Sequence, residues 1–139
     1  MDYKKLANAA REARKLAYVP YSGFRVGAAL LIKNGEIILG CNIENAAYSP
    51  TNCAERTAFF AAIAAGHRDF KAIAVAGWSK EGAPDDLAYP CGVCRQVMME
   101  FCEPQNFEII IVKRSEEKEI EVLPLYKIMP YGFGPSNLN

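Results

Sequence analysis

The sequence has no excess of charge of either sign, no long hydrophobic run and almost no histidine. Its 139 residues include 16 Lys and Arg against 16 Asp and Glu, which gives a formal net charge of zero. A neutral chain lacks the broad basic surface with which proteins bind nucleic acid duplexes. Neither a signal peptide nor an apolar run of the ~20 residues needed to span a membrane is present. We therefore expect a cytoplasmic protein that binds neither nucleic acids nor membranes.

Histidine occurs once and cysteine five times. We interpret His67 as a surface residue and not a metal ligand, because it follows Gly66 at a predicted helix end, where a cation is favourable. The odd number of cysteines, with a Cys-x-x-Cys pair among them, indicates metal binding before disulfides in a reducing cytosol. We expect the two cysteines outside the motif described below, Cys41 and Cys102, to be buried apolar positions.

Hydrophobic periodicity and turn residues predict the order helix, two hairpin strands, helix, strand, helix, strand, strand. The predicted helices cover residues 3–18, 53–65 and 91–101, and the predicted strands cover 24–33, 36–42, 71–78, 107–113 and 119–123. Asn34-Gly35 predicts a tight hairpin turn, and the tail after Pro124 is at most a short helix followed by irregular chain. The order predicts one domain, residues 1–139, with a mixed sheet and helices on both faces.

Two short motifs contain the residues that are candidates for metal binding and catalysis. Cys53 is followed by Ala54 and Glu55, and further along stand Pro90-Cys91-Gly92-Val93-Cys94, a pattern typical of zinc deaminases. Both motifs fall at the starts of predicted apolar helices, where free N–H groups and partial positive charge favour thiolates. Three thiolates on Zn²⁺ leave one tetrahedral position open, as in catalytic sites.

Two residues beside Cys53 complete the predicted centre. Glu55 lies close enough to take a proton from a zinc-activated water and to deliver it to a ring nitrogen and then to a leaving amine. Three thiolates and Zn²⁺ carry a net charge of minus one. We hypothesise that Arg56 offsets this charge by donating hydrogen bonds to the ligand sulfurs.

Each part of this pattern also has a simpler interpretation. Asn52-x-x-Glu55 fits a capping box, Cys-x-x-Cys is often structural zinc or redox-active, and a lone Cys53 is most often a buried hydrophobe. The conjunction of both motifs favours a catalytic zinc site. A structural-zinc binding module would need a fourth protein ligand, which Glu55 could supply, and a redox protein using Cys91 and Cys94 is the most distant alternative.

Beyond the metal motifs the sequence resembles the small cytidine deaminases. The resemblance covers roughly residues 10–100, and it rests on YSGFRVGA at 21–28, NIENAAY at 42–48, CAER at 53–56 and PCGVCRQ at 90–96. It implies a three-layer α/β/α sandwich with a mixed five-stranded sheet. It also implies a homotetramer that hydrolytically deaminates cytidine and 2′-deoxycytidine to the uridines in pyrimidine salvage.

The resemblance assigns roles residue by residue. It gives zinc binding to the three cysteines of the motifs and proton transfer to Glu55. Asn42 and Glu44 would hold the ribose hydroxyl, and strand alternation places both on one face. The backbone N–H of Ala54 would bind the pyrimidine carbonyl oxygen, and Phe24 would line the base pocket. A neighbouring subunit completes the site in this family, and the candidates here are Tyr48 and Phe133.

The sequence departs from the family pattern in two places. The loop from Ser79 to Tyr89 is longer and more acidic than usual, and Tyr89 stands where the family commonly has serine. The backbone carbonyl at this position is expected to accept a hydrogen bond from the leaving amine, so the side chain is free to vary. A blasticidin-type or polynucleotide deaminase therefore stays the nearest alternative, although Asn42 and Glu44 favour a free ribose.

Three further features have structural interpretations. We expect Trp78 to lie in the core or at a subunit interface and Arg95 to form an ordinary ion pair. Gly132-Phe133-Gly134 is too short to be a phosphate loop.

Overall fold

The structure is a computed structural model that describes residues 3–79, 87–115 and 120–138. Its elements are α1 (Lys4–Arg14), β1 (Phe24–Ile32), β2 (Ile37–Cys41), α2 (Ala54–Ala64), β3 (Phe70–Ser79), α3 (Gly92–Phe101), β4 (Glu108–Val112), β5 (Glu121–Pro124), α4 (Leu125–Ile128) and a 3₁₀ turn (Pro135–Asn137). None of the described helices is long and apolar enough to cross a membrane. The acidic part of the predicted 79–89 loop and most of the charged turn at 115–118 lie outside the described residues.

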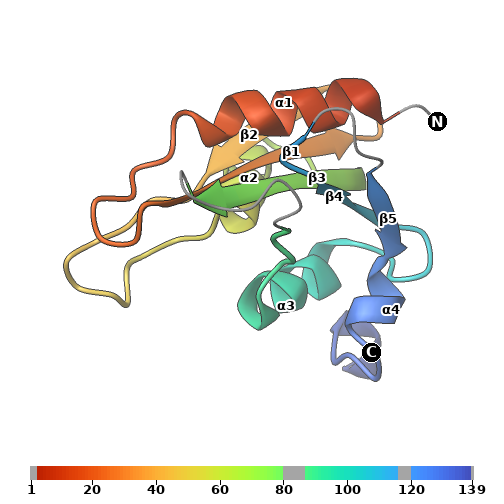
Figure 1. Cartoon of the computed structure of the whole chain (residues 1–139). Helices are drawn as coiled ribbons and strands as arrows, with labels where there is room; N and C mark the ends of the chain where they lie inside the picture. Colours follow the sequence, from red (N-terminus) through yellow and green to blue (C-terminus); the bar gives the residue numbers. More distant parts are fainter. Residues whose placement is uncertain (1–2, 80–86, 116–119, 139) are drawn as a thin grey trace.

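The five strands form one mixed sheet in the order β2-β1-β3-β4-β5. Strand β1 pairs antiparallel with both β2 and β3, β3 pairs parallel with β4, and β4 pairs antiparallel with β5. Helix α3 connects the parallel pair, and α1 covers one face of the sheet while α2 and α3 lie on the other (Figure 1). The predicted α/β architecture with helices on both faces is confirmed.

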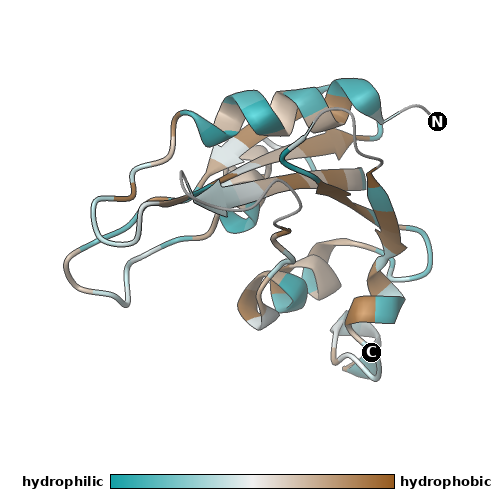
Figure 2. Cartoon of the chain, viewed as in Figure 1, coloured by the Kyte–Doolittle hydropathy of each residue, from teal (hydrophilic) through white to brown (hydrophobic). Residues whose placement is uncertain are grey.

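The two faces of the sheet have separate cores because side chains alternate along each strand. On β1, Ala29 and Leu31 pack with Leu6 and its neighbours on α1. The intervening Ala28 and Leu30 pack on the opposite side with α2 and α3. Figure 2 shows the result, with mostly hydrophobic strands beneath a mostly hydrophilic α1. The side occupied by α2 and α3 carries the candidate site.

The β1–β2 hairpin forms where Asn34-Gly35 predicts it. Leu31 pairs with Ile37, and the turn is closed by a 2.9 Å hydrogen bond from Gly35 N to Ile32 O. Gly35 has a φ of 100°, which glycine adopts without the steric cost that a Cβ would bring.

Helix α1 ends at Arg14, four residues before the predicted end at residue 18. Pro20 is the local signal for a helix end in the sequence, but the chain leaves the helix before it. Tyr18 forms a parallel bridge with Ile43, in which its N–H donates to Asn42 O and its carbonyl accepts from Glu44 N. A residue cannot supply this bridge and also continue the helical hydrogen bonds, so the long-range pairing overrides the local helical pattern.

Helix α2 ends at a Schellman motif, as the glycine after it predicts. Gly66 has a φ of 95°. Its N–H donates to Ile63 O, and the N–H of His67 donates to Ala62 O. The apolar composition of residues 53–65 predicts a helix buried on all sides, but this prediction is wrong, because Phe60 is 49% exposed and Ala61, Ala64 and Ala65 are exposed as well.

Two glycines allow helices to approach the hairpin closely from opposite faces. A Cβ on Gly27 of β1 would lie 2.2 Å from Ala10 O and from Arg14 N of α1. A Cβ on Gly40 of β2 would lie 2.4 Å from Ala54 O and 2.5 Å from Ala58 N of α2. The absence of a side chain at Gly40 thus determines how closely the first turn of α2, next to Cys53, can lie on the sheet.

Gly27→Ala is expected to lower the free energy of unfolding by at least about 2 kcal/mol, a cost typical of overpacking a close contact. The added methyl meets backbone atoms of α1 and no flexible side chain that could move aside. Urea unfolding measures the loss. Gly92→Ala is the matched control, since a Cβ there meets no atom within 4 Å and alanine favours a helix. A Gly27→Ala protein as stable as the control would contradict the close packing.

Candidate metal centre and active site

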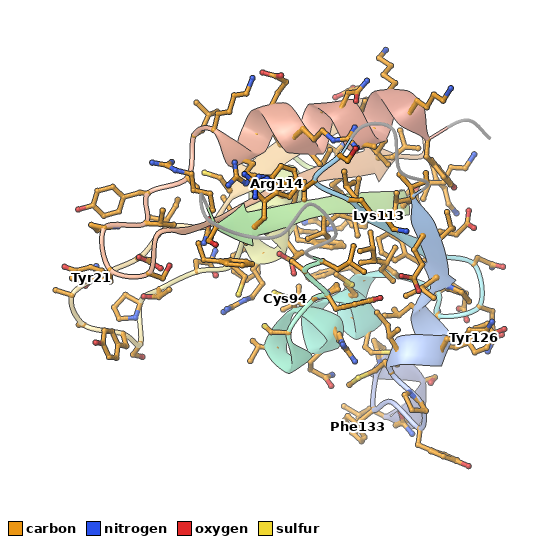
Figure 3. The ribbon with its side chains drawn as sticks, in the orientation of Figure 1. Tyr21, Cys94, Lys113, Arg114, Tyr126 and Phe133 are labelled. Carbon is orange, nitrogen blue, oxygen red and sulfur yellow. The ribbon has the colours of Figure 1, made fainter. Side chains whose placement is uncertain are left out.

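Three cysteine thiols from two helix starts converge on one point. Cys53 is the N-cap of α2 and Cys91 is the N-cap of α3, and Cys94 lies in the first turn of α3. The Sγ atoms of Cys53 and Cys91 are 3.7 Å apart, and those of Cys91 and Cys94 are 3.5 Å apart. Figure 3 shows Cys94 at the start of α3, beneath the sheet. The predicted convergence is therefore present.

The three thiols fit a tetrahedral zinc ion. All three ligand atoms lie within 4.8 Å of one another. Zn–S bonds of about 2.3 Å at tetrahedral angles place sulfurs about 3.8 Å apart, close to the two distances above. Among the described residues the set includes no fourth His, Cys, Asp or Glu. Cys94 is buried whereas Cys91 is exposed, and a tetrahedral ion on these three thiols would have a fourth position that no residue of the cluster fills.

The charge state of the thiols depends on their mutual hydrogen bonds. A hydrogen bond with Cys94, aided by one from Arg56, lowers the pKa of Cys53 to about 5, against the opposing effect of burial. The same bond to Cys53, together with burial, raises the pKa of Cys94. Arg56 Nη2 lies 3.2 Å from Cys53 Sγ, which is the contact that we hypothesise from the sequence. Cys53 thus lies beside a fixed positive charge that favours its thiolate form.

Glu55 is buried in the first turn of α2, with 4% of its surface exposed. Burial raises the pKa of its carboxyl to about 7, and the negative charge of the Cys53 thiolate acts in the same direction. A carboxyl with this pKa can both accept and donate a proton near neutral pH.

The capping-box interpretation of Asn52 and Glu55 is wrong. The N-cap is Cys53, which makes no side-chain capping bond. Asn52 instead donates from Nδ2 to Thr57 Oγ1 at 3.1 Å, and that hydroxyl donates to Cys53 O at 3.1 Å. The carboxyl of Glu55 is therefore not required to cap the helix.

A family model described as the cytidine and deoxycytidylate deaminase zinc-binding region matches residues 1–109. This match includes both cysteine motifs and the buried glutamate. The chain belongs to the cytidine and deoxycytidylate deaminase family. Curated relatives agree over the whole chain: a cytidine deaminase of Sporosarcina psychrophila is 48% identical over 100% of this chain and 96% of the relative.

Solved structures of the family share the fold as well. The crystal structure of cytidine deaminase from Burkholderia pseudomallei superposes with a TM-score of 0.84 at 43% identity, covering 96% of this chain and 100% of that one. A curated cytidine deaminase of Halalkalibacterium halodurans is 45% identical over 100% of this chain and 99% of the relative. The family provides a zinc-binding region, which agrees with the three-thiol geometry of this chain.

The predicted nucleoside-binding residues lie on the segment after β2 and at the start of β1. The Asn42 amide joins the two: Oδ1 accepts from Val26 N at 2.9 Å and Nδ2 donates to Phe24 O at 2.8 Å. Glu44 accepts from the backbone N–H groups of Tyr21 and Ser22 at 3.0 and 3.1 Å. These hydrogen bonds fix both side chains.

Glu44 and Tyr48 border one hollow, which Tyr21 and Thr51 also line. The two loops that contain these residues project from the same end of the sheet (Figure 1). The hollow has a volume of about 360 Å³, and Tyr48 is 80% exposed. Hydrogen bonds of Ser22 with the Glu44 carboxylate lower its pKa. Glu44 thus stays anionic at neutral pH on the surface of the projecting loops.

The remaining predicted site residues lie at a helix start and in the tail. Ala54 is the first residue of α2, so its N–H is among the amides that lack an intrahelical acceptor. Phe133 is 56% exposed, beyond α4, and Figure 3 shows it below α3 and apart from Cys94.

The structural interpretations of four other residues have mixed outcomes. Trp78 is buried in the core beneath Arg14, whose guanidinium lies 4.4 Å from the ring centroid. Cys102 is buried as expected, but Cys41 is partly exposed. The predicted ion pair of Arg95 is wrong, because its guanidinium donates to two backbone carbonyls. This role could not be predicted from the sequence, because both acceptors are backbone carbonyls, which every residue provides.

Proposed function

We propose that this chain is a zinc-dependent enzyme that hydrolytically deaminates cytidine and 2′-deoxycytidine to uridine and 2′-deoxyuridine. The observation that carries the proposal is the set of three thiols, open at one coordination position, with the buried Glu55 next to Cys94. A structural zinc would require a fourth ligand. The described part of the chain offers none within the cluster.

Different residues of the chain bind the zinc ion and transfer the protons. Cys53, Cys91 and Cys94 would hold the zinc ion, which supplies an activated water for attack at the amino-bearing carbon of the base. Glu55 moves the protons, first to the ring nitrogen and then to the leaving amine. Its burial excludes bulk water from this transfer, and its elevated pKa suits a group that must both take and give a proton.

The nucleoside contacts in this proposal follow the described hydrogen bonds. Asn42 and Glu44 hold the ribose hydroxyl, since Glu44 is anionic and both side chains are fixed by backbone groups. The N–H of Ala54 binds the pyrimidine carbonyl oxygen at the start of α2, and Phe24 lines the base pocket.

A homotetramer in which neighbours complete each site accounts for the exposed apolar side chains. Phe60 on α2 and Val93 on α3 are 49% and 56% exposed, and Tyr48 and Phe133 are more than half exposed. Exposed apolar side chains of this size mark an interaction surface where they gather. Tyr48 and Phe133 are the residues that we assign to the site of a neighbouring copy, in a cytoplasmic enzyme of pyrimidine salvage.

Arg56→Ala is expected to weaken zinc binding and kcat/KM by roughly 10–100-fold, the loss typical of removing a hydrogen-bond partner of a metal ligand. The substitution removes the 3.2 Å contact with Cys53 Sγ. A chelator competition measures zinc affinity alongside turnover. Arg68→Ala, at the exposed opposite end of α2, is the control. If Arg56→Ala matches the control in both measurements, Arg56 has no part in the centre.

The substrate assignment is tested with purified zinc-loaded protein and four compounds: cytidine, 2′-deoxycytidine, free cytosine and adenosine. Chromatography should detect uridine and 2′-deoxyuridine from the first two and little product from the others, because cytosine has no ribose and adenosine has a purine base. Zinc-loaded protein that leaves cytidine unchanged would contradict the proposal.

A further inference from the structure

The guanidinium of Arg95 joins two segments that are far apart in sequence. Its Nε donates to Pro90 O at 2.7 Å and its Nη1 donates to Ile128 O at 2.6 Å. Pro90 is almost fully buried and directly precedes Cys91. Ile128 is the last residue of α4. One side chain, directly after Cys94, therefore contacts the segment with the exposed zinc-ligand candidate and the start of the C-terminal tail.

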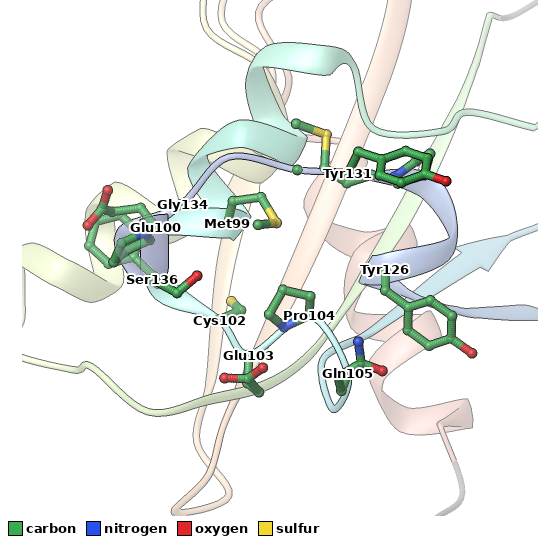
Figure 4. Close-up of a pocket in the computed structure, with 15 residues that line it drawn as sticks. Met99, Glu100, Cys102, Glu103, Pro104, Gln105, Tyr126, Tyr131, Gly134 and Ser136 are labelled. Carbon is green, nitrogen blue, oxygen red and sulfur yellow. The ribbon is translucent and has the colours of Figure 1, made fainter. Parts of the chain in front are cut away.

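The rest of the tail also lies along α3. Gln96 Nε2 donates to Phe133 O at 2.8 Å. A Cβ on Gly132 would lie 3.0 Å from Met99 Cε, and one on Gly134 would lie 3.3 Å from Met99 O. Figure 4 shows Gly134 beside Met99, with Tyr131 on the part of the tail that precedes it. Gly132 and Gly134 thus let the backbone on either side of Phe133 approach α3, while the Phe133 side chain stays 56% exposed.

The first part of the tail is fixed by α4, where Leu125 is fully buried in the core and Ile128 and Met129 pack against it. Helix α4 has four residues and the 3₁₀ turn has three. A cavity of about 650 Å³ separates parts of the tail from the end of α3, bordered by Met99, Cys102, Tyr126 and Tyr131 among others (Figure 4). The hydrogen bonds of Arg95 and Gln96 connect the tail to α3 beside this cavity.

Arginine is suited to this connection for a geometric reason. The two carbonyls are met by different nitrogens of one planar group, Nε and Nη1. A lysine ammonium is a single point of donation on a flexible stem and does not reproduce this fork. Loss of the arginine would also leave the buried Pro90 carbonyl without its charged hydrogen-bond donor. A buried acceptor without a partner lowers the stability of the fold.

We propose that Arg95 is a positioning residue that couples the zinc-ligand segment Pro90–Cys94 to the C-terminal tail carrying Phe133. The proposal rests on the proposed function for the identity of the metal and for the role of Phe133. It goes beyond that function because the conformation of the tail then depends on the conformation of the zinc-ligand segment Pro90–Cys94. Such coupling is reciprocal: binding of zinc should fix the tail, and release of the tail should weaken the binding of zinc.

The test measures tail attachment by limited trypsin cleavage after Lys127, which is exposed in α4. Mass spectrometry follows release of residues 128–139 from the full protein, with and without a chelator. Cleavage after the exposed Lys15 at the end of α1 is the internal control. In the native protein, removing zinc should speed cleavage after Lys127 by on the order of 10-fold and leave cleavage after Lys15 unchanged.

Two variants separate coupling from simple tail binding. In the Arg95→Lys protein, trypsin should cleave rapidly after Lys127 even with zinc present, and the chelator should not increase this rate further. The same protein should bind zinc about 10-fold more weakly in the chelator competition. Gln96→Ala removes the hydrogen bond to Phe133 O but leaves both hydrogen bonds of Arg95 in place, so its cleavage after Lys127 should still respond to the chelator. A native protein whose Lys127 cleavage ignores zinc overturns the proposal, as does an Arg95→Lys protein that keeps the zinc response. Neither readout depends on deamination, so failure of the proposed function would be distinguished by the substrate assay.

Discussion

Replacing Glu55 with glutamine is expected to lower kcat for cytidine by roughly 10²–10⁴-fold or more, the contribution of a positioned proton-transfer group. Glutamine has nearly the same size, so it fits a position that is only 4% exposed. It cannot take up a proton, and it leaves Cys53, Cys91 and Cys94 intact. The zinc content should therefore match that of the native protein when turnover and metal are measured on one sample.

Glu12→Gln is the matched control for this experiment. Glu12 pairs with Lys15 on the exposed side of α1, with 67% of its side chain accessible, and its loss should leave turnover unchanged. If Glu55→Gln keeps its zinc and also turns over cytidine at a rate near that of Glu12→Gln, Glu55 is not the proton shuttle. If it loses zinc instead, the carboxylate helps to hold the metal.

Cys94→Ser is expected to abolish both zinc binding and turnover. Cys94 is the most buried of the three thiols, and a serine hydroxyl is a far poorer zinc ligand than a thiolate. The loss of zinc affinity should exceed the roughly 10–100-fold effect of losing an outer hydrogen-bond partner. Metal analysis after dialysis and a chelator competition measure it.

Thermal unfolding gives an independent readout of the same substitution. A metal that binds only the folded state stabilises it by mass action, so the native protein should melt at a higher temperature with zinc than after chelation. Cys94→Ser should lose this difference. Cys41→Ser is the control, because Cys41 is partly exposed and lies outside the thiol cluster. A zinc-dependent melting temperature that survives in Cys94→Ser would place the metal elsewhere.

Local signals in the sequence predicted most of the elements. Asn34-Gly35 located the hairpin, Gly66 marked the end of α2, and Pro90 marked the start of α3 to within two residues. These signals work because turns, caps and helix starts depend on the conformational limits of one or two residues.

Long-range contacts explain where the predictions failed. Helix α1 ends early because Tyr18 pairs with Ile43, and no residue near Tyr18 in the sequence indicates this long-range pairing. The exposure of α2 at Phe60 could not be predicted from apolar composition, because a core and an interaction surface draw on the same residue types.

The candidate site likewise contains residues that the sequence predicts and contacts that it does not predict. The three cysteines and Glu55 could be found from sequence because the chemistry demands those residue types at fixed spacing. The contact from Arg56 to Cys53 was hypothesised from charge, and the structure contains it at 3.2 Å. The fork of Arg95 between Pro90 and Ile128 could not be predicted, since its acceptors are backbone carbonyls that any sequence provides.

We expect one zinc ion held by the three thiols to be required for deamination. The most direct measurement strips the native protein with a chelator, removes the chelator and adds zinc back in steps while following conversion of cytidine to uridine. Activity should be absent at the start, rise in proportion to added zinc and level off at about one ion per chain, as expected for a single three-cysteine centre. Turnover that persists in the stripped, metal-free protein would contradict the account, as would fully reloaded protein that never converts cytidine.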